Sequence, residues 1–155
     1  MKINLTLLTI LFFIAQSCSK PDQYQVNLNQ SRAFLEANLL EEGTYEVELG
    51  LQYQVLKSGD PAGKNPSTTD TITAHFHGTL IDGSVFWSSV EMGEPLTVEL
   101  SKLIPGCQKV LSLMRPGDIW RAYIDPELAY GIEGRPSIPP NSALIFEIEL
   151  ISINQ

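Results

Sequence analysis

A regular alternation of apolar and polar residues over Thr71–Leu80 constrains the fold of this chain more than any other feature. Ile72, Ala74 and Phe76 fall on one face of an extended segment, and the residues between them fall on the other. A strand with one buried face has this two-residue period. The pattern also predicts strands at 51–56, 119–124 and 144–150, and shorter strands at 85–88 and 96–100. Asp82-Gly83 predicts a tight turn between the strands at 71–80 and 85–88.

Only one short helix is expected among these strands. It runs from Pro105 to Leu113, with proline in its first turn, and Arg115-Pro116-Gly117-Asp118 ends it. The sequence therefore predicts an α+β fold, in which a curled antiparallel β-sheet wraps around one short α-helix. A chain of 155 residues has room for one such domain, which we expect at 44–155.

An amphipathic helix is predicted before the domain, at residues 29–43. Its apolar residues recur at helical spacing, and Gly43 marks its end. These apolar residues are Phe34, Leu35, Leu39 and Leu40. A helix of this length is marginal in water on its own. We expect it to pack on its own domain or to space the domain from a membrane, and packing on another chain is the alternative.

The first 17 residues resemble an export signal. Lys2 is followed by an apolar run, Ile3–Ile14. As a helix this run would reach about 18 Å, well short of the roughly 30 Å hydrocarbon layer of a membrane, so a secretory signal fits better than a spanning segment. The small residues before Cys18 resemble a bacterial lipobox, in which the cysteine is acylated and becomes the first residue of the mature protein. Ordinary cleavage after Ser17, which would leave Cys18 a free thiol, is the alternative.

A lipid on Cys18 would define the rest of the amino-terminal region. Residues 1–17 would be the signal peptide and 18–28 a tether to the membrane. The chain has two cysteines, so a lipidated Cys18 leaves Cys107 without a disulfide partner. Several acyl chains hold a domain at a membrane surface without any spanning segment. We expect an exported protein that a lipid anchors in the bacterial envelope, at the outer membrane, on the periplasmic side or at the cell surface.

Charge and motifs exclude several classes of function. The chain has 18 Asp and Glu against ten Lys and Arg, a formal charge of −8, and no basic patch, so a nucleic-acid partner is excluded. It has no nucleophile elbow, HExxH, CxxC or glycine-rich phosphate loop, and we expect no cofactor and no metal. His75 and His77 share one side of a strand but have no third ligand near them in sequence, which favours a solvated strand face over a metal site.

Five blocks of sequence resemble FKBP-type peptidyl-prolyl cis-trans isomerases in their order and spacing. The blocks are Ala74–Phe86, Leu103–Gly106, Arg115–Asp118, Pro126–Gly131 and Ile138–Leu150. The resemblance extends over residues 51–151. The segments Phe34-Leu35-Glu36 and Gly50–Leu56 are similar to the exported bacterial branch of the family, the macrophage infectivity potentiator type, without the long dimerising arm of that branch.

The resemblance implies an enzyme that eases rotation about Xaa-Pro bonds in proteins folding in the bacterial envelope, in an apolar pocket and without a cofactor. Proline-containing polypeptides would be its partners. It assigns catalytic positions to Phe86, Tyr130 and Phe146. It assigns substrate-binding positions to Phe76, Leu96, Val98, Leu103, Ile104, Cys107 and Ile138. The backbone N–H of Ile104 and the hydroxyl of Tyr130 would be the hydrogen-bond donors of this pocket.

The chain departs from the family at several pocket positions. Phe86-Trp87-Ser88-Ser89 stands where members usually have Phe-Asp-Ser-Ser, Phe76 where they have Tyr, and Cys107 where they have Trp. In the family the Tyr hydroxyl and the Asp carboxylate are hydrogen-bonded neighbours. Because this chain lacks both, neither group is left in the pocket without its hydrogen-bond partner. Trp87 would partly fill the space that Cys107 leaves. The loop before Ile138 is one residue shorter than usual and has Arg135 where His is common.

The sequence is also compatible with two other functions. The departures at Phe76, Trp87 and Cys107 leave room for a catalytically weak or inactive binding module with the same fold. Lipid-anchored relatives of this kind are associated with gliding machinery, so a part in a surface or gliding complex is conceivable for such a module. A general chaperone with no preference for proline is the third possibility.

Overall fold

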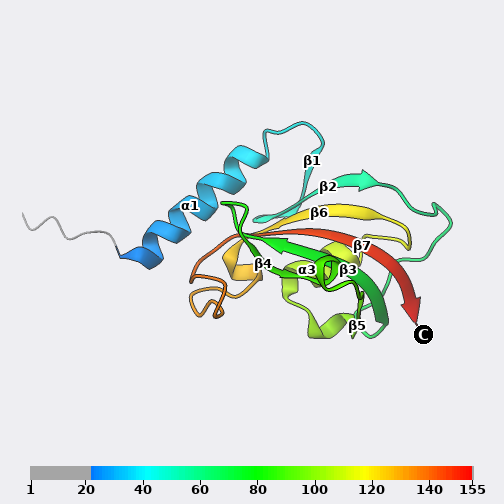
Figure 1. The fold of residues 1–155 in the computed structure, drawn as a ribbon. Helices are drawn as coiled ribbons and strands as arrows, with labels where there is room; N and C mark the ends of the chain where they lie inside the picture. Colours follow the sequence, from blue (N-terminus) through cyan, green and yellow to red (C-terminus); the bar gives the residue numbers. More distant parts are fainter. Residues whose placement is uncertain (1–21, 155) are drawn as a thin grey trace, which may run out of the picture.

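The computed structural model describes residues 22–154, so the predicted signal peptide and Cys18 lie outside the described residues. The described chain folds as an α+β domain with one curled sheet, as the alternation predicts (Figure 1). Its elements are, in order, α1 (Gln23–Asn38), β1 (Thr44–Glu48), β2 (Leu51–Lys57), β3 (Thr71–Thr79), β4 (Val85–Ser88), α2 (Ser89–Met92), β5 (Leu96–Glu99), the 3₁₀ turn η1 (Leu100–Lys102), α3 (Pro105–Leu111), β6 (Ile119–Ile124), the 3₁₀ turn η2 (Pro126–Leu128) and β7 (Leu144–Asn154).

The described strands form a seven-stranded antiparallel sheet in the order β1-β2-β6-β7-β3-β4, and β5 also pairs with β3. The predicted two-residue period of β3 is confirmed, because its residues alternate between buried and half-buried along the whole strand. The turn at Asp82-Gly83 is also confirmed: Gly83 has a φ of +84°, and its N–H donates to the carbonyl of Leu80 at 3.0 Å.

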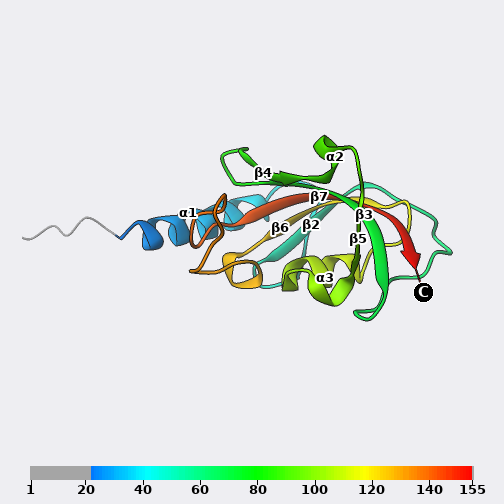
Figure 2. The same ribbon diagram turned by 60° about the horizontal axis from the view of Figure 1, so that its bottom comes forward.

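The core lies between the sheet and α3, which covers one side of it (Figure 2). Val110 and Leu111 of this helix are fully buried, as is Met114 just after it. Gly106 lets the helix approach the sheet closely, since a Cβ atom there would lie 2.4 Å from the Ile124 side chain. This contact fixes the start of α3 relative to β6.

Helix α1 starts earlier than predicted. It begins at Gln23 rather than Asn29 and ends at Asn38 rather than Gly43, so most of the predicted tether is helical. The side chain of Asp22 caps its first turn by accepting from the N–H of Tyr24 at 3.3 Å. Amide pairs four residues apart, such as Gln25 with Asn29 at 2.9 Å, support this polar first half.

The buried face of α1 also differs from the prediction. Its buried residues are Ser31, Leu35 and Asn38, whereas Leu39 and Leu40 are 38% and 88% exposed. Leu35 packs on Tyr123 and Ala143 of the same domain. Two of the three buried positions are polar because their side chains bond to loops and strands that lie far away in the sequence. The helix packs on its own domain, which was one of the two expectations.

Three local features differ from the prediction at the sheet edges. Strand β1 and the short helix α2 were not predicted, and β7 continues to Asn154. His75 and His77 are half-buried and not merely solvated. The Nδ1 atom of each ring lies 3.0 Å from a serine hydroxyl, that of Ser89 for His75 and that of Ser88 for His77. These contacts hold the turn from β4 into α2 against β3. Among residues 22–154, no helix has the length and apolar character needed to cross a membrane.

Candidate active site

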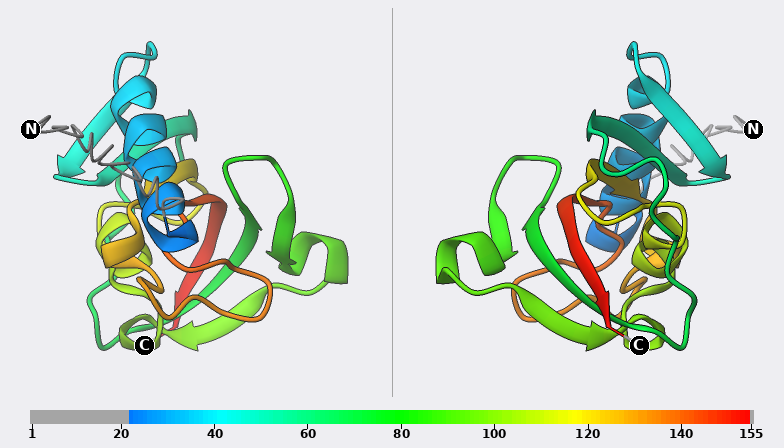
Figure 3. Two further views of the ribbon diagram at one scale, coloured as in Figure 1. Left: turned by 90° about the vertical axis from the view of Figure 1, so that its left-hand side faces the viewer. Right: turned by 90° about the vertical axis from the view of Figure 1, so that its right-hand side faces the viewer.

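A cavity of about 510 Å³ opens beside the concave face of the sheet. Figure 3 shows β4 and α2 on the far side of the molecule from α3, with the loop 131–143, in orange, running from one side towards the other. The residues that line the cavity come from β3, β4, β5, β7, the start of α3 and the turn before it, and the loop after η2: Phe76, Phe86, Trp87, Leu96, Lys102, Leu103, Ile104, Cys107, Tyr130, Arg135, Ser137, Ile138 and Phe146.

Three phenylalanine rings form one wall. Phe146 meets Phe86 edge to face, with ring centroids 5.4 Å apart, and meets Phe76 in the same way at 6.2 Å. Edge-to-face contacts are favourable for aromatic rings and hold them at fixed angles. Gly78 makes the arrangement possible, because a Cβ atom there would lie 2.5 Å from the Phe86 ring and 2.9 Å from the Phe146 ring.

Trp87 also faces the cavity and is one of its lining residues. It pairs with Gly78, an inward-facing residue of β3, and the register shifts between Gly78 and Thr79. In such a bulge two residues of one strand oppose a single residue of the other, so the neighbours Phe86 and Trp87 both point inward. The Trp87 ring centroid lies 6.3 Å from that of Phe76, and the cavity stays open beside it.

The start of α3 forms the floor and one edge. Cys107 is 2% exposed, and burial raises the pKa of its thiol to about 12, so the thiol stays neutral and unreactive. Ile104 is the residue before the helix, and among the described residues its backbone N–H has no protein acceptor. Gln108 donates to the carbonyl of Leu103 at 2.7 Å, which holds this turn in shape. The arrangement leaves one backbone donor available beside an apolar floor.

The loop after η2 forms the opposite wall. Ile138 is 5% exposed, and its N–H donates to the carbonyl of Arg135 at 2.9 Å. The Arg135 guanidinium carbon lies 4.7 Å from the centre of the Tyr130 ring, a cation–π contact at the mouth of the cavity. Ile132, the other isoleucine of this loop, is 63% exposed and does not line the cavity.

The cavity brings together nine of the ten residues to which the resemblance assigns the site. Val98 is the exception: it pairs with Ile72 of β3 and is half-buried against the core, outside the lining of the cavity. Trp87, Lys102, Arg135 and Ser137 line the cavity but were not assigned to the site. A period-two pattern places Trp87 on the opposite face from Phe86, and the other three lie in turns whose shape the sequence pattern does not predict.

The lining suits binding by shape rather than covalent chemistry. Its only charged members are Lys102 and Arg135, both exposed at the rim, and it contains no carboxylate. Within residues 22–154, no three histidine, cysteine or acidic side chains come together as a metal-binding group. The arrangement combines an apolar cavity with one free backbone amide, that of Ile104, and one phenol, that of Tyr130.

Comparison with known proteins defines the class. Residues 63–151 match the family described as "FKBP-type peptidyl-prolyl cis-trans isomerase". The match covers more than half of the chain and includes every residue that lines the cavity, so this chain belongs to the FKBP-type peptidyl-prolyl cis-trans isomerase family.

Individual relatives agree with this assignment. The chain is 46% identical over 130 residues to the peptidyl-prolyl cis-trans isomerase Mip of Coxiella burnetii, covering 83% of this chain and 56% of that protein. It is 41% identical to the outer membrane protein MIP of Legionella longbeachae, covering 83% and 55%. The crystal structure of FkpA from Escherichia coli superimposes with a TM-score of 0.80 at 38% identity, covering 84% of this chain and 61% of FkpA. The chain thus spans little more than half the length of these proteins.

Proposed function

We propose that this chain catalyses cis-trans isomerisation of Xaa-Pro bonds in polypeptides, without a covalent intermediate. The observation that carries the proposal is the open aromatic cavity, in which Phe76, Phe86 and Phe146 surround a space of about 510 Å³ beside the free Ile104 amide. A catalytically inactive binding module would have the same fold. The residues that differ from the usual family members, Phe76, Trp87 and Cys107, line the cavity without closing it. The relatives at 41–46% identity include a named isomerase.

The reaction needs no nucleophile because no bond has to break. Resonance makes the amide planar, and rotation about it faces a barrier of about 18–20 kcal/mol. Uncatalysed isomerisation of an Xaa-Pro bond takes tens to hundreds of seconds. A twisted amide has lost this resonance and carries less charge on its oxygen. A cavity that excludes water therefore favours the twisted state over the planar one, which lowers the barrier.

Each wall of the cavity has a part in this scheme. The three phenylalanine rings and Ile138 hold the proline ring, with Trp87 and Cys107 completing the apolar surface. The Ile104 N–H donates to a carbonyl of the bound peptide and fixes its direction, and the Tyr130 hydroxyl at the mouth is a second donor. Fixed donors in a site of low polarity stabilise a particular geometry more strongly than water does.

A refolding assay tests the proposal. The substrate is a protein whose slow refolding phase is limited by proline isomerisation, and the assay adds the full-length chain in a mild detergent. We expect acceleration in proportion to enzyme concentration, with losses of at least tenfold in Tyr130→Ala and Phe146→Ala. Absence of acceleration by the unmodified chain contradicts the proposal. Equal suppression of aggregation for clients with and without proline would indicate a general chaperone instead.

We also propose that the protein is exported and held in the bacterial envelope by a lipid on Cys18. The support is the short apolar amino terminus, the lipobox-like residues before Cys18, and the relative named as an outer membrane protein. Because α1 begins at Gln23, the chain between Cys18 and the domain reaches at most about 18 Å. The domain would then sit directly on the membrane surface rather than at the end of a long tether.

Fractionation tests the anchor. Cells grown with a labelled fatty acid should yield labelled protein in the membrane fraction, and Cys18→Ser should lose both label and membrane association. Cys107→Ser is the matched control and should keep both. An unlabelled protein, or a Cys18→Ser protein that still carries the label, contradicts the proposal.

A further inference from the structure

The loop that forms one wall of the cavity contains no helix or strand. It lies between η2 and β7 and carries Tyr130, Arg135 and Ile138. Inside it, Arg135 and Ile138 exchange backbone hydrogen bonds, and the Asn141 N–H donates to the carbonyl of Gly131 at 2.8 Å. These bonds close the loop on itself but do not attach it to the rest of the domain.

Helix α1 supplies that attachment. The Ser31 hydroxyl donates to the carbonyl of Asn141 at 2.9 Å and accepts from the N–H of Ala143 at 2.8 Å. The Asn27 side chain donates to the carbonyl of Pro140 at 2.8 Å. Ser31 is 1% exposed, so water cannot replace these bonds, and a buried backbone group left without a partner is costly.

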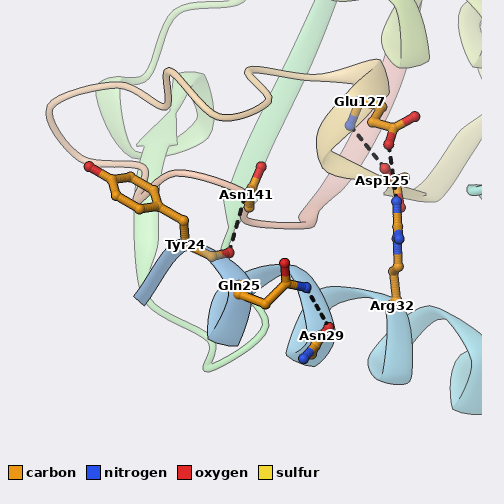
Figure 4. Close-up of polar contacts among 7 residues, drawn as sticks. All are labelled: Tyr24, Gln25, Asn29, Arg32, Asp125, Glu127 and Asn141. Carbon is orange, nitrogen blue, oxygen red and sulfur yellow. Dashed lines mark hydrogen bonds and ion pairs between the residues drawn. The ribbon is translucent and has the colours of Figure 1, made fainter. Parts of the chain in front are cut away.

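Asn141 shows that this end of the loop is held in an unfavourable conformation. Its φ is +56°, and among the described residues it is the one non-glycine residue with a positive φ. Its N–H bonds to Gly131, its carbonyl accepts from Ser31, and its side-chain amide donates to the carbonyl of Tyr24 at 3.1 Å (Figure 4). Two of its three anchors therefore come from α1.

The other end of the loop has a weaker link to the same helix. Arg32 forms an ion pair with Glu127 at 3.0 Å, and Figure 4 shows this pair further along α1 than Tyr24, which contacts Asn141. Both side chains are more than half exposed, so the pair adds little by itself. The buried Ser31 contact is the strong one.

We propose that Ser31, supported by Asn27, is a positioning residue of the isomerase site. Helix α1 holds the end of the loop, and the loop places Ile138 and Tyr130 against the substrate. The helix lies outside residues 63–151, the part that matches the family, so the matched domain does not provide this support by itself. The inference rests on the proposed isomerase activity, which it deepens.

The same helix provides a matched control. Asn38, near the other end of α1, donates to the Gln52 side chain at 2.8 Å, and Gln52 donates to the carbonyl of Leu35 at 2.8 Å. This contact is as buried as that of Ser31, but it joins α1 to β2 and not to the cavity loop. Removing it weakens the attachment of the helix without touching the loop.

The experiment compares Ser31→Ala with Asn38→Ala in the full-length chain. The first measurement is kcat and KM on Xaa-Pro peptides. We expect kcat/KM to fall about tenfold in Ser31→Ala, mainly through a higher KM, and to stay within twofold in Asn38→Ala, while both variants lose thermal stability. Equal effects of the two variants on kcat/KM overturn the proposal. Asn27→Ala, which removes a less buried bond, replaces Ser31→Ala if that variant does not fold.

The second measurement does not depend on activity. Amide hydrogen exchange of Asn141 and Arg135 should become at least tenfold faster in Ser31→Ala and remain unchanged in Asn38→Ala. If the unmodified chain has no isomerase activity, the proposed function fails, and the exchange data still decide whether α1 holds the loop. Exchange that is unchanged in Ser31→Ala, or equally faster in both variants, contradicts the positioning role.

Discussion

Substitution of Gly78 by alanine should separate catalysis from folding. The new Cβ atom would lie 2.5 Å and 2.7 Å from two carbons of the Phe86 ring and 2.9 Å from one carbon of the Phe146 ring. Carbon atoms in contact are about 3.5–4.0 Å apart, so the two rings must retreat by about 1 Å. Overpacking of this kind costs about 1–3 kcal/mol of stability.

The effect on activity should be larger than the effect on stability. A displacement of about 1 Å at a reacting centre can lower a rate by about 10²-fold. We therefore expect kcat/KM on Xaa-Pro peptides to fall by about 10- to 100-fold in Gly78→Ala, while the far-UV circular dichroism of the protein is retained. Calorimetry measures the accompanying loss of stability.

A second glycine outside the cavity provides the control. At Gly59 a Cβ atom would lie 2.2 Å from the carbonyl oxygen of Pro116, a clash at least as severe. Gly59→Ala should therefore lose stability but keep kcat/KM per folded molecule within about twofold. The reasoning is refuted if Gly78→Ala keeps full activity, or if both variants lose activity in proportion to stability.

Three further predictions concern individual residues of the cavity. Tyr130→Phe keeps the ring but loses the hydroxyl, so kcat/KM should fall about tenfold with stability changed by less than about 1 kcal/mol; unchanged kinetics exclude the phenol as a donor. Because burial raises the pKa of Cys107 from 9.0 to about 12, the unfolded chain loses this proton first, and the free energy of unfolding should fall between pH 9 and pH 12. Urea titrations should show this fall reduced in Cys107→Val, and an identical pH dependence contradicts the assignment. Lys102 and Arg135 are the only charged lining residues, so peptides with Glu before proline should have a severalfold higher kcat/KM than those with Lys at low salt. The preference should vanish at high salt and in a Lys102→Ala/Arg135→Ala variant; no difference at low salt contradicts it.

Six of the seven described strands, all but β1, could be predicted because each carries its own signal. Alternation in β3 and in the first part of β7 reflects one buried face, and this face is set by residues two apart in the same segment. The start of α3 could be predicted equally well, since Pro105 occupies the first helical turn. Local chemistry determines these features, and the fold class follows from them.

The start and the buried face of α1 could not be predicted in this way. Ser31 and Asn38 are buried by partners at Asn141, Ala143 and Gln52, which no helical pattern reveals. Apolar periodicity correctly indicates Leu35, which is buried, but it also indicates Leu39 and Leu40, which are exposed. Long-range polar contacts override the local signal here.

Most residues of the cavity could be predicted, but not all of them. The order of the sequence blocks was enough to assign Phe76, Phe86 and Phe146 to it. Trp87 was not assigned, because a bulge opposite Gly78 turns it to the same side as its neighbour. Position in the sequence therefore identifies the walls of the site, while bulges and turns decide which further side chains complete them.

The central claim is that an apolar cavity without nucleophile or metal speeds rotation about a prolyl bond. Exchange spectroscopy by NMR on an Xaa-Pro tetrapeptide tests it most directly, with the protein present in small substoichiometric amounts. Uncatalysed isomerisation takes tens to hundreds of seconds, too slow to give exchange peaks between the cis and trans resonances. The account predicts that such peaks appear on addition of the protein and weaken in Phe146→Ala. Peptide resonances that shift on binding but show no exchange peaks would contradict it.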